Sequence, residues 1–187
     1  MTADTPILSR LLILADVAPD GTHKRVVATP EERAALSRDL HLPGIARLEA
    51  ELVIRPWARH GFRVTGTVAA DVTQTCVVSL EPVDQSLAET IDLKLVPPSE
   101  AHRYEPKRNA DGEIELDATA EDPPDVLDGP TVDLGRIVEE HFVLGLDPYP
   151  RKAGVSFEAA IGAAKAAGEG ADAPASPFAA LSRLKKD

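Results

Sequence analysis

The side chains best suited to chemistry in this sequence lie in one short stretch, residues 55–63. Within nine residues it holds three arginines, a histidine and the only tryptophan of the chain: Arg55, Trp57, Arg59, His60 and Arg63. Guanidinium groups hold phosphate and aromatic rings stack on unpaired bases, so this stretch is a candidate RNA-binding site. The alternative is structural, with Trp57 covering an edge of the core and the arginines keeping that edge soluble.

The distribution of charge limits where a nucleic acid could bind. The chain of 187 residues has a net charge of −11, but residues 64–150 carry −14, whereas residues 1–63 carry +1 and residues 151–187 carry +2. A phosphate backbone would be repelled by the middle of the chain. A second and weaker candidate site is therefore the basic tail, with Arg183, Lys185 and Lys186. The alternative for the acidic middle is a solvated surface that keeps the protein soluble.

The sequence shows no catalytic, metal or cofactor signature. Its five histidines are scattered and none has a partner at metal-ligand spacing, and no phosphate loop, dinucleotide fingerprint or hydrolase elbow is present. We expect a protein that is not an enzyme and that binds neither a metal nor a cofactor. We interpret Cys76, the single cysteine, as a small core residue rather than a reactive thiol. The acids between residues 113 and 128 are interpreted as a solvated loop rather than a cation site.

The hydropathy pattern gives no reason to expect a membrane protein. The longest apolar run near the start, residues 11–15, is too short to cross a bilayer or to serve as the core of a signal peptide. We expect a cytoplasmic protein that does not contact membranes. The sequence leaves the oligomeric state open, and a monomer is favoured.

Period-2 alternation of apolar and polar residues predicts the elements that position the 55–63 stretch. Residues 46–55 and 62–72 alternate regularly and should form a long antiparallel hairpin, with the stretch at its tip. Residues 87–95 continue the meander after a turn at 81–84. Shorter strands are expected at 7–14 and 26–28, and a helix should begin after Thr29, with Pro30 and Glu32 as start signals, and end by His41 or Leu42.

The second half of the chain is predicted to cover and extend this sheet. Residues 97–130 are acidic and rich in proline, which indicates a long loop, with an edge strand at 113–117. Residues 131–146 have helical periodicity, and their apolar second half should be buried against the meander. The expected fold is α+β, an antiparallel β-meander covered by one main helix. It forms a single domain over residues 1–150, followed by a linker at 151–175 and a short basic helix at 176–187.

Three ordered motifs of this sequence resemble one family. Residues 76–83 (CVVSLEPV) are similar to the Cys-x-x-Cys-Leu-x-x-Val segment of the YceD family, also called large ribosomal RNA subunit accumulation proteins. Residues 132–140 with 144–150 resemble the family's acidic helix, and residues 176–185 its Asn-Pro-Phe tail. The matching positions are Cys76, Ser79, Leu80, Val83, Asp133, Leu134, Glu139, Glu140, Leu144, Leu146, Pro177 and Phe178.

The resemblance implies a bacterial cytoplasmic protein without known catalytic activity, needed for normal levels of the large-subunit (23S) ribosomal RNA and hence for 50S assembly. Its partners would be that RNA, ribosome-assembly proteins, or both. Many members carry cysteines that suggest a metal, but here the second motif position is Ser79 and no other cysteine exists, so a zinc site is not carried over. The turn would then depend on packing of Leu80 and Val83. Two functions remain open, an assembly factor that contacts RNA and an acidic protein-interaction adaptor that does not.

Overall fold

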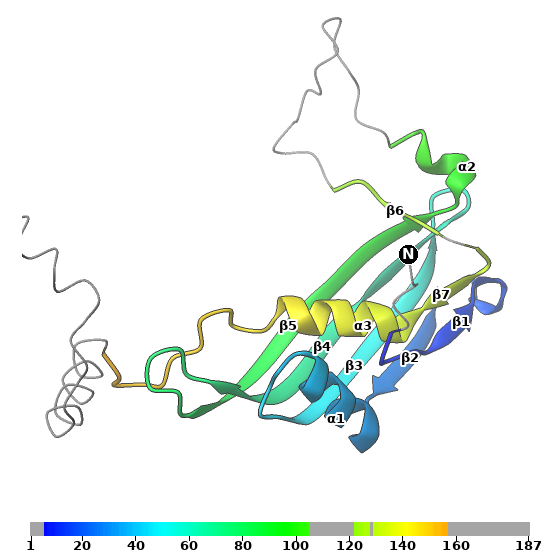
Figure 1. Cartoon of the computed structure of the whole chain (residues 1–187). Coiled ribbons are helices and arrows are strands. Elements are labelled where there is room, and N and C mark those ends of the chain that lie inside the picture. Colours follow the sequence, from blue (N-terminus) through cyan, green and yellow to red (C-terminus); the bar gives the residue numbers. More distant parts are fainter. Residues whose placement is uncertain (1–5, 105–121, 128, 157–187) are drawn as a thin grey trace, which may run out of the picture. The chain divides into compact units, whose positions relative to one another are not determined.

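The structure is a computed structural model that describes residues 6–104, 122–127 and 129–156 (Figure 1). These residues fall into two compact units, one comprising 6–74 and 84–148 and the other 75–83 with 149–156. In the described part of the first unit, a five-stranded sheet has the order β2-β3-β4-β5-β6, and β1 pairs with β7. The sheet is mostly antiparallel and helices are few, which confirms the predicted α+β class.

The predicted hairpin is the centre of the sheet. β3 spans Gly44–Trp57 and β4 spans Gly61–Thr75, paired antiparallel with Leu52 opposite Gly66 and Trp57 opposite Gly61. β2, Thr22–Val27, pairs antiparallel with β3 and is longer than predicted. The strand residues that form the buried face of this sheet are Val26, Ile45, Leu48, Ala50, Leu52, Ile54, Val64, Val68, Ala70, Val72, Ile91 and Leu95.

β5 begins earlier than predicted. It spans Pro82–Val96, so residues 82–84 are strand rather than turn, and the chain reverses instead between Cys76 and Leu80, where Leu80 adopts a left-handed φ of 60°. After β5, the region predicted as a long loop contains a short helix, α2 (Pro98–Ala101), and β6 (Asp125–Val126), which pairs parallel with the end of β5. The predicted edge strand at 113–117 lies outside the described residues.

The first helix follows its sequence signals closely. α1 spans Pro30–Asp39, and the Thr29 side chain and Glu32 exchange both hydrogen bonds of a capping box, with Pro30 at the first helical position. Its residue Leu36 is buried, and the helix packs on β3. The prediction of a single covering helix was therefore incomplete, because α1 also covers part of the sheet.

The second main helix is shorter than predicted. Thr131–Asp133 form a strand, β7, that pairs antiparallel with β1 (Leu11–Ile13), and α3 spans Leu134–Leu144. The predicted strand over 7–14 is likewise reduced to β1, because residues 7–10 form no strand and a 3₁₀ turn, η1, occupies Leu14–Asp16. Asp133 has extended backbone angles and caps α3. The residues that helical periodicity had assigned to the first turn of this helix therefore belong to the strand β7 instead.

The end of α3 corrects another prediction. The helix buries Leu134, Ile137, Val138 and Phe142 against the sheet, but Val143 is 40% exposed and Leu144 is 79% exposed. Apolar residues all round the last turn were predicted to be buried. However, the sheet covers only one side of α3, so the outward side chains of that turn face solvent whatever their polarity.

Candidate functional site

The tip of the β3–β4 hairpin is joined by side chains from two other elements. Lys94 of β5 places its Nζ atom 5.6 Å from the centroid of the Trp57 ring, and the Tyr104 ring, which follows α2, lies 5.9 Å from Trp57 centroid to centroid, tilted by 35°. We call this group, with the exposed side chains of Arg55 and Arg59, the tip cluster. It combines cationic groups with two adjacent aromatic rings, the combination that holds phosphates and unpaired bases.

The backbone of the hairpin determines how tightly the tip packs. Ala58 adopts a left-handed φ of 52°, which closes the turn between Trp57 and Gly61. A Cβ atom on Gly61 would lie 2.6 Å from the carbonyl oxygen of Leu95, so only glycine allows β5 to run this close to the turn. This close approach brings Lys94, the neighbour of Leu95, to the face of Trp57.

The cationic groups of the stretch 55–63 differ in how far acidic side chains of the protein already pair with them. Arg63 forms a bidentate ion pair with Asp92, with N–O distances of 2.7 and 2.6 Å, and this pair lowers the pKa of Asp92. The His60 ring lies 3.2 Å from Glu100. Arg55 and Arg59, by contrast, have no ion pair among the residues that the structure describes. The structure thus brings four of the five predicted residues to one exposed tip but neutralises Arg63 largely through Asp92.

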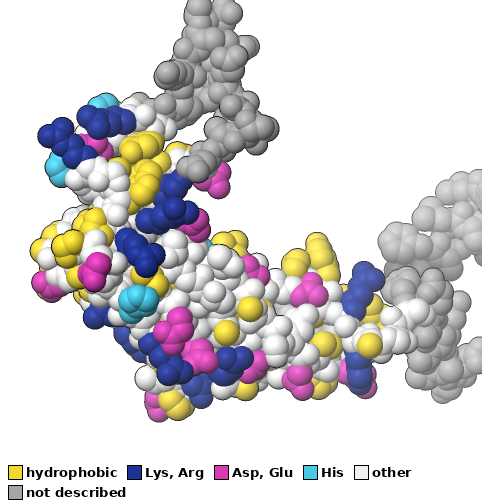
Figure 2. All heavy atoms as spheres, turned by 180° about the vertical axis from the view of Figure 1, so that it is seen from behind, with side chains coloured by type: hydrophobic (Ala, Val, Ile, Leu, Met, Phe, Trp, Pro, Cys, Tyr) yellow, Lys and Arg dark blue, Asp and Glu magenta, His cyan; other side chains and the backbone are white. Residues whose placement is uncertain are grey.

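Figure 2 shows basic and histidine side chains gathered at the end of the molecule that carries α2 and the β3–β4 turn. Sequence reasoning missed the contributions of Lys94 and Tyr104 to this end. Lys94 interrupts an apolar run between Leu93 and Leu95, which is a weak signal, whereas Tyr104 lies in a segment predicted as loop. Their proximity to Trp57 depends on strand register and on the path of the chain after β5, and neither is evident from the sequence.

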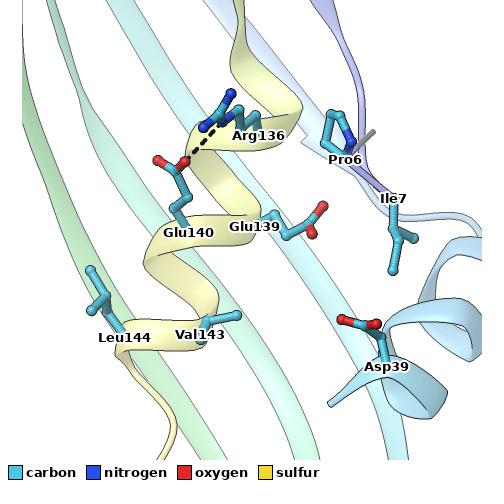
Figure 3. A pocket seen from close by; sticks show the side chains of 8 residues that line it. All are labelled: Pro6, Ile7, Asp39, Arg136, Glu139, Glu140, Val143 and Leu144. Atoms are coloured by element: carbon cyan, nitrogen blue, oxygen red, sulfur yellow. Dashed lines mark hydrogen bonds and ion pairs between the residues drawn. The ribbon is translucent and has the colours of Figure 1, made fainter. Parts of the chain in front are cut away.

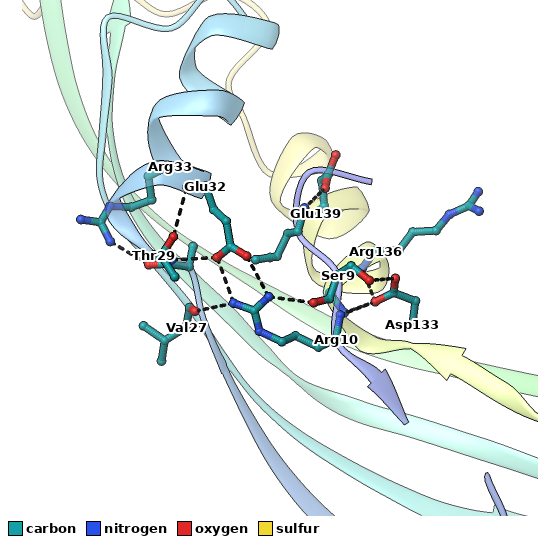
Figure 4. A network of polar contacts seen from close by, with 12 residues as sticks. Ser9, Arg10, Val27, Thr29, Glu32, Arg33, Asp133, Arg136 and Glu139 are labelled. Carbon is teal, nitrogen blue, oxygen red and sulfur yellow. Dashed lines mark hydrogen bonds and ion pairs between the residues drawn. The ribbon is translucent and has the colours of Figure 1, made fainter. Parts of the chain in front are cut away.

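A second polar site joins the N-terminal segment, residues 6–10, to the helices α1 and α3 (Figure 4). The Asp133 carboxylate accepts hydrogen bonds from the backbone N–H groups of Gly135 and Arg136 at the start of α3. It also accepts from the Arg10 backbone N–H and the Ser9 hydroxyl, both at 2.6 Å. Burial raises the pKa of Asp133, but these four donors outweigh it and the pKa stays below its ordinary value.

The same segment reaches two further carboxylates. Glu139 of α3 accepts a hydrogen bond from the backbone N–H of Leu8 at 2.9 Å. Arg10 forms a bidentate ion pair with Glu32 of the α1 capping box, at 2.8 and 2.9 Å. The hydrogen bond from Arg10 is the main reason that the pKa of Glu32 is lowered. Gly135 permits this arrangement, because a Cβ there would lie 2.5 Å from the Leu8 carbonyl oxygen.

In the second unit, the turn after β4 is organised around the Cys76 thiol. Cys76 is fully buried, as predicted, and its Sγ atom accepts N–H groups from Ser79 and Lys152, each at 3.4 Å. The hydrogen bond from the Ser79 side chain, followed by these N–H donors, lowers the pKa of Cys76 to about 6. Leu80 is 77% exposed, so hydrogen bonds rather than packing of Leu80 stabilise the turn, contrary to the prediction.

A family model described as large ribosomal RNA subunit accumulation protein YceD matches residues 64–185. The chain belongs to the YceD family. No curated protein and no solved structure matches the chain. The YceD match begins directly after the 55–63 stretch, so within the tip cluster it includes Lys94 and Tyr104 but none of the hairpin-tip residues.

Most described YceD motif positions have structural roles. Asp133 and Glu139 bind the N-terminal segment, Leu134 is buried, Leu146 packs at the edge of the core, and Glu140 pairs with Arg136 at 2.9 Å. Leu80 and Leu144 are exceptions, because both are exposed. The motif positions Pro177 and Phe178 lie outside the described residues, as do Arg183, Lys185 and Lys186 of the basic tail, the predicted linker beyond residue 156 and the predicted terminal helix.

The residues at the Cys76 turn do not fit a zinc site of the kind that the YceD motif suggests. The turn supplies one thiol and, at the second motif position, the hydroxyl of Ser79, whereas structural zinc needs four ligands, usually thiolate or imidazole. In the described ranges, no three His, Cys, Asp or Glu side chains are grouped closely enough to hold a metal ion. Across these same residues, no helix is both long and apolar enough to span a membrane.

Proposed function

We propose that this YceD-family chain is a non-catalytic cytoplasmic factor that supports accumulation of the large-subunit (23S) ribosomal RNA and 50S assembly, and that it contacts RNA directly through the tip cluster. The family description supports the connection to large-subunit ribosomal RNA. The observation that carries the direct contact is the grouping of Trp57, Tyr104 and Lys94 at a hairpin tip whose Arg55 and Arg59 have no ion-pair partner in the described chain.

The mode of contact follows from these side chains. Arg55 and Arg59 would bind phosphates, and the exposed surfaces of the two rings would stack on unpaired bases. Because Lys94 already lies over the Trp57 ring, its ammonium group would add a phosphate contact next to a stacked base. Such a site prefers single-stranded or looped RNA and reads little sequence, which suits a factor acting on unfolded segments of a long RNA.

The test is the salt dependence of binding to fragments of large-subunit ribosomal RNA. Each phosphate contact contributes about 0.7–0.9 to the slope of log K against log salt concentration, so removing both Arg55 and Arg59 should lower the slope by about 1.4–1.8. Arg63 is left in place because Asp92 already pairs with it. The matched control is Lys24→Ala with Arg38→Ala, which removes the same charge from exposed sites outside the tip.

The outcomes separate RNA contact from general electrostatics. An equal change of slope in the tip variant and the control would mean that net charge, not the tip cluster, drives binding. Replacement of Trp57 by Leu should weaken binding without changing the slope, because stacking releases no counterions. Absence of binding by the parent at low salt would exclude direct RNA contact and leave the adaptor function.

A further inference from the structure

A groove on the outer side of α3 is not used by the proposed RNA contact. It has a volume of about 560 Å³ and lies between α3, the end of α1 and the N-terminal segment. Its lining residues are Pro6, Ile7, Asp39, Arg136, Glu139, Glu140, Val143 and Leu144. In Figure 3, Glu139 and Val143 point from α3 toward Ile7 and Asp39, while Glu140 and Leu144 project from a neighbouring side of the helix. We call it the α3 groove.

The apolar part of the α3 groove is open to solvent. Leu144 is 79% exposed and Val143 is 40% exposed, whereas Phe142, on the side of α3 that faces the core, is fully buried. Pro6 and Ile7 line the same groove, so four apolar residues contribute to its lining. Exposed apolar side chains gathered in a concave site and rimmed by charges are typical of protein interaction sites.

The charges of the α3 groove select its occupant. The lining holds three carboxylates, from Asp39, Glu139 and Glu140, and one guanidinium, that of Arg136, which already pairs with Glu140 at 2.9 Å. One oxygen of Glu139 accepts the Leu8 N–H. The net charge of the lining is thus negative, so the groove repels nucleic acid and attracts a cationic ligand.

We propose that the α3 groove binds a basic amphipathic helix of a partner protein. Apolar side chains on one stripe of that helix, spaced i, i+3 and i+4, would enter the groove against Ile7, Val143 and Leu144. Lys and Arg side chains flanking the stripe would pair with Asp39 and Glu140 at the rim. This partner surface goes beyond the RNA contact, because it shares no residue with the tip cluster and has the opposite charge.

The test measures binding of a fluorescein-labelled 14-residue helical peptide by anisotropy, with Leu at i, i+3 and i+4 positions and Lys elsewhere. In the full chain, Leu144→Gln and Glu140→Gln should each weaken binding about fivefold or more. Matched controls replace an exposed leucine on β1 and an exposed glutamate at the start of α1, Leu11→Gln and Glu31→Gln, and should change affinity less than twofold. A peptide with Glu in place of every Lys should bind at least tenfold more weakly.

Several results would overturn this proposal. Equal losses of peptide affinity in the groove and control variants would mean that the peptide is attracted non-specifically to an acidic protein. Equal binding of the Lys and Glu peptides would mean that the charge of the groove does not determine its ligand. If Leu144→Gln turned a dimer into a monomer in light scattering, the occupant would be a second copy. Peptide affinity raised by Phe178→Gln would indicate competition by this chain's own tail. RNA binding should be unaffected by Leu144→Gln, so this test fails or succeeds independently of the tip cluster.

Discussion

Replacing Asp133 by alanine should destabilise the first unit severely, whereas asparagine should be tolerated. Alanine removes the acceptor for two N–H groups of α3, a cap whose loss typically costs about 1 kcal/mol. It also leaves the partly buried Arg10 N–H without its carboxylate, and a hydrogen bond to a charged group contributes about 1.5–3 kcal/mol. The Ser9 hydroxyl is exposed and adds little, because water can replace the carboxylate.

The expected loss for Asp133→Ala is therefore about 2–4 kcal/mol in the free energy of unfolding. Asparagine keeps one oxygen for the Gly135, Arg136 and Arg10 donors and turns its amide toward the Ser9 hydroxyl, which can accept. Asp133→Asn should cost less than about 1 kcal/mol for this reason. The control is Asp20→Ala in the exposed turn before β2, which should stay within about 0.5 kcal/mol of the parent.

Urea unfolding followed by circular dichroism at neutral pH measures these differences. For a chain of this size, 1 kcal/mol corresponds to about 2–4 °C in Tm, so Asp133→Ala should melt about 4–16 °C below the parent. An asparagine variant as unstable as the alanine variant, or an alanine variant as stable as the parent, would refute the role assigned to this carboxylate.

The pH dependence gives an independent check. The folded-state pKa of Asp133 lies below its ordinary value, so its contribution is fully present above about pH 3.9, the unfolded value, and is lost as the pH falls through the folded one. The unfolding free energies of the parent and Asp133→Ala should converge in strong acid. A gap that widened on acidification would contradict this sign.

Three further outcomes are expected. Leu144→Asp should leave Tm unchanged within about 2 °C, because the side chain is exposed, whereas Phe142→Ala should lower the free energy of unfolding by about 3–5 kcal/mol. Melts followed by circular dichroism compare the two variants. A Leu144→Asp variant that did not fold would mean that this side chain is buried. Elemental analysis of protein purified without chelator should find far less than one zinc per chain, and one equivalent would contradict the interpretation of the Ser79 turn. Absorbance of the Cys76 thiolate at 240 nm should titrate near pH 6. The free energy of unfolding should rise with pH between there and about 8.5, the ordinary pKa of an unfolded thiol. A titration midpoint at about 8.5 would exclude the N–H···S contacts.

Local signals in the sequence predicted the elements that depend on neighbouring residues. The Thr29–Glu32 capping box and the period-2 strands around the hairpin were both confirmed. These features rest on contacts within a few residues or on a single face that must be buried. The alternation on either side of the stretch 55–63 was therefore sufficient to place it correctly at a hairpin tip.

Features that depend on distant pairing could not be predicted. Thr131 and Val132 have helical periodicity with the residues after them, yet they pair with β1, more than 110 residues earlier. The exposure of Leu144 depends on which side of α3 the sheet covers, not on the residue type. At the tip, Asp92 of β5 pairs with Arg63, and Tyr104, from the segment after β5, packs near Trp57. The paths of β5 and of that segment have no local signal in the sequence.

The contacts of the N-terminal segment bear on how the chain matures during synthesis. Leu8 donates to Glu139 across 131 residues of sequence, and Arg10 donates to Asp133 across 123. At about 5–20 residues per second, the partners of this segment leave the ribosome roughly 6–26 s after it does. Throughout that interval, residues 8–10 lack their α3 acceptors, and β1 lacks β7. The first unit therefore completes its fold only near the end of its own translation, and a nascent chain interrupted before Asp133 would expose the unpaired β1 to chaperones and proteases.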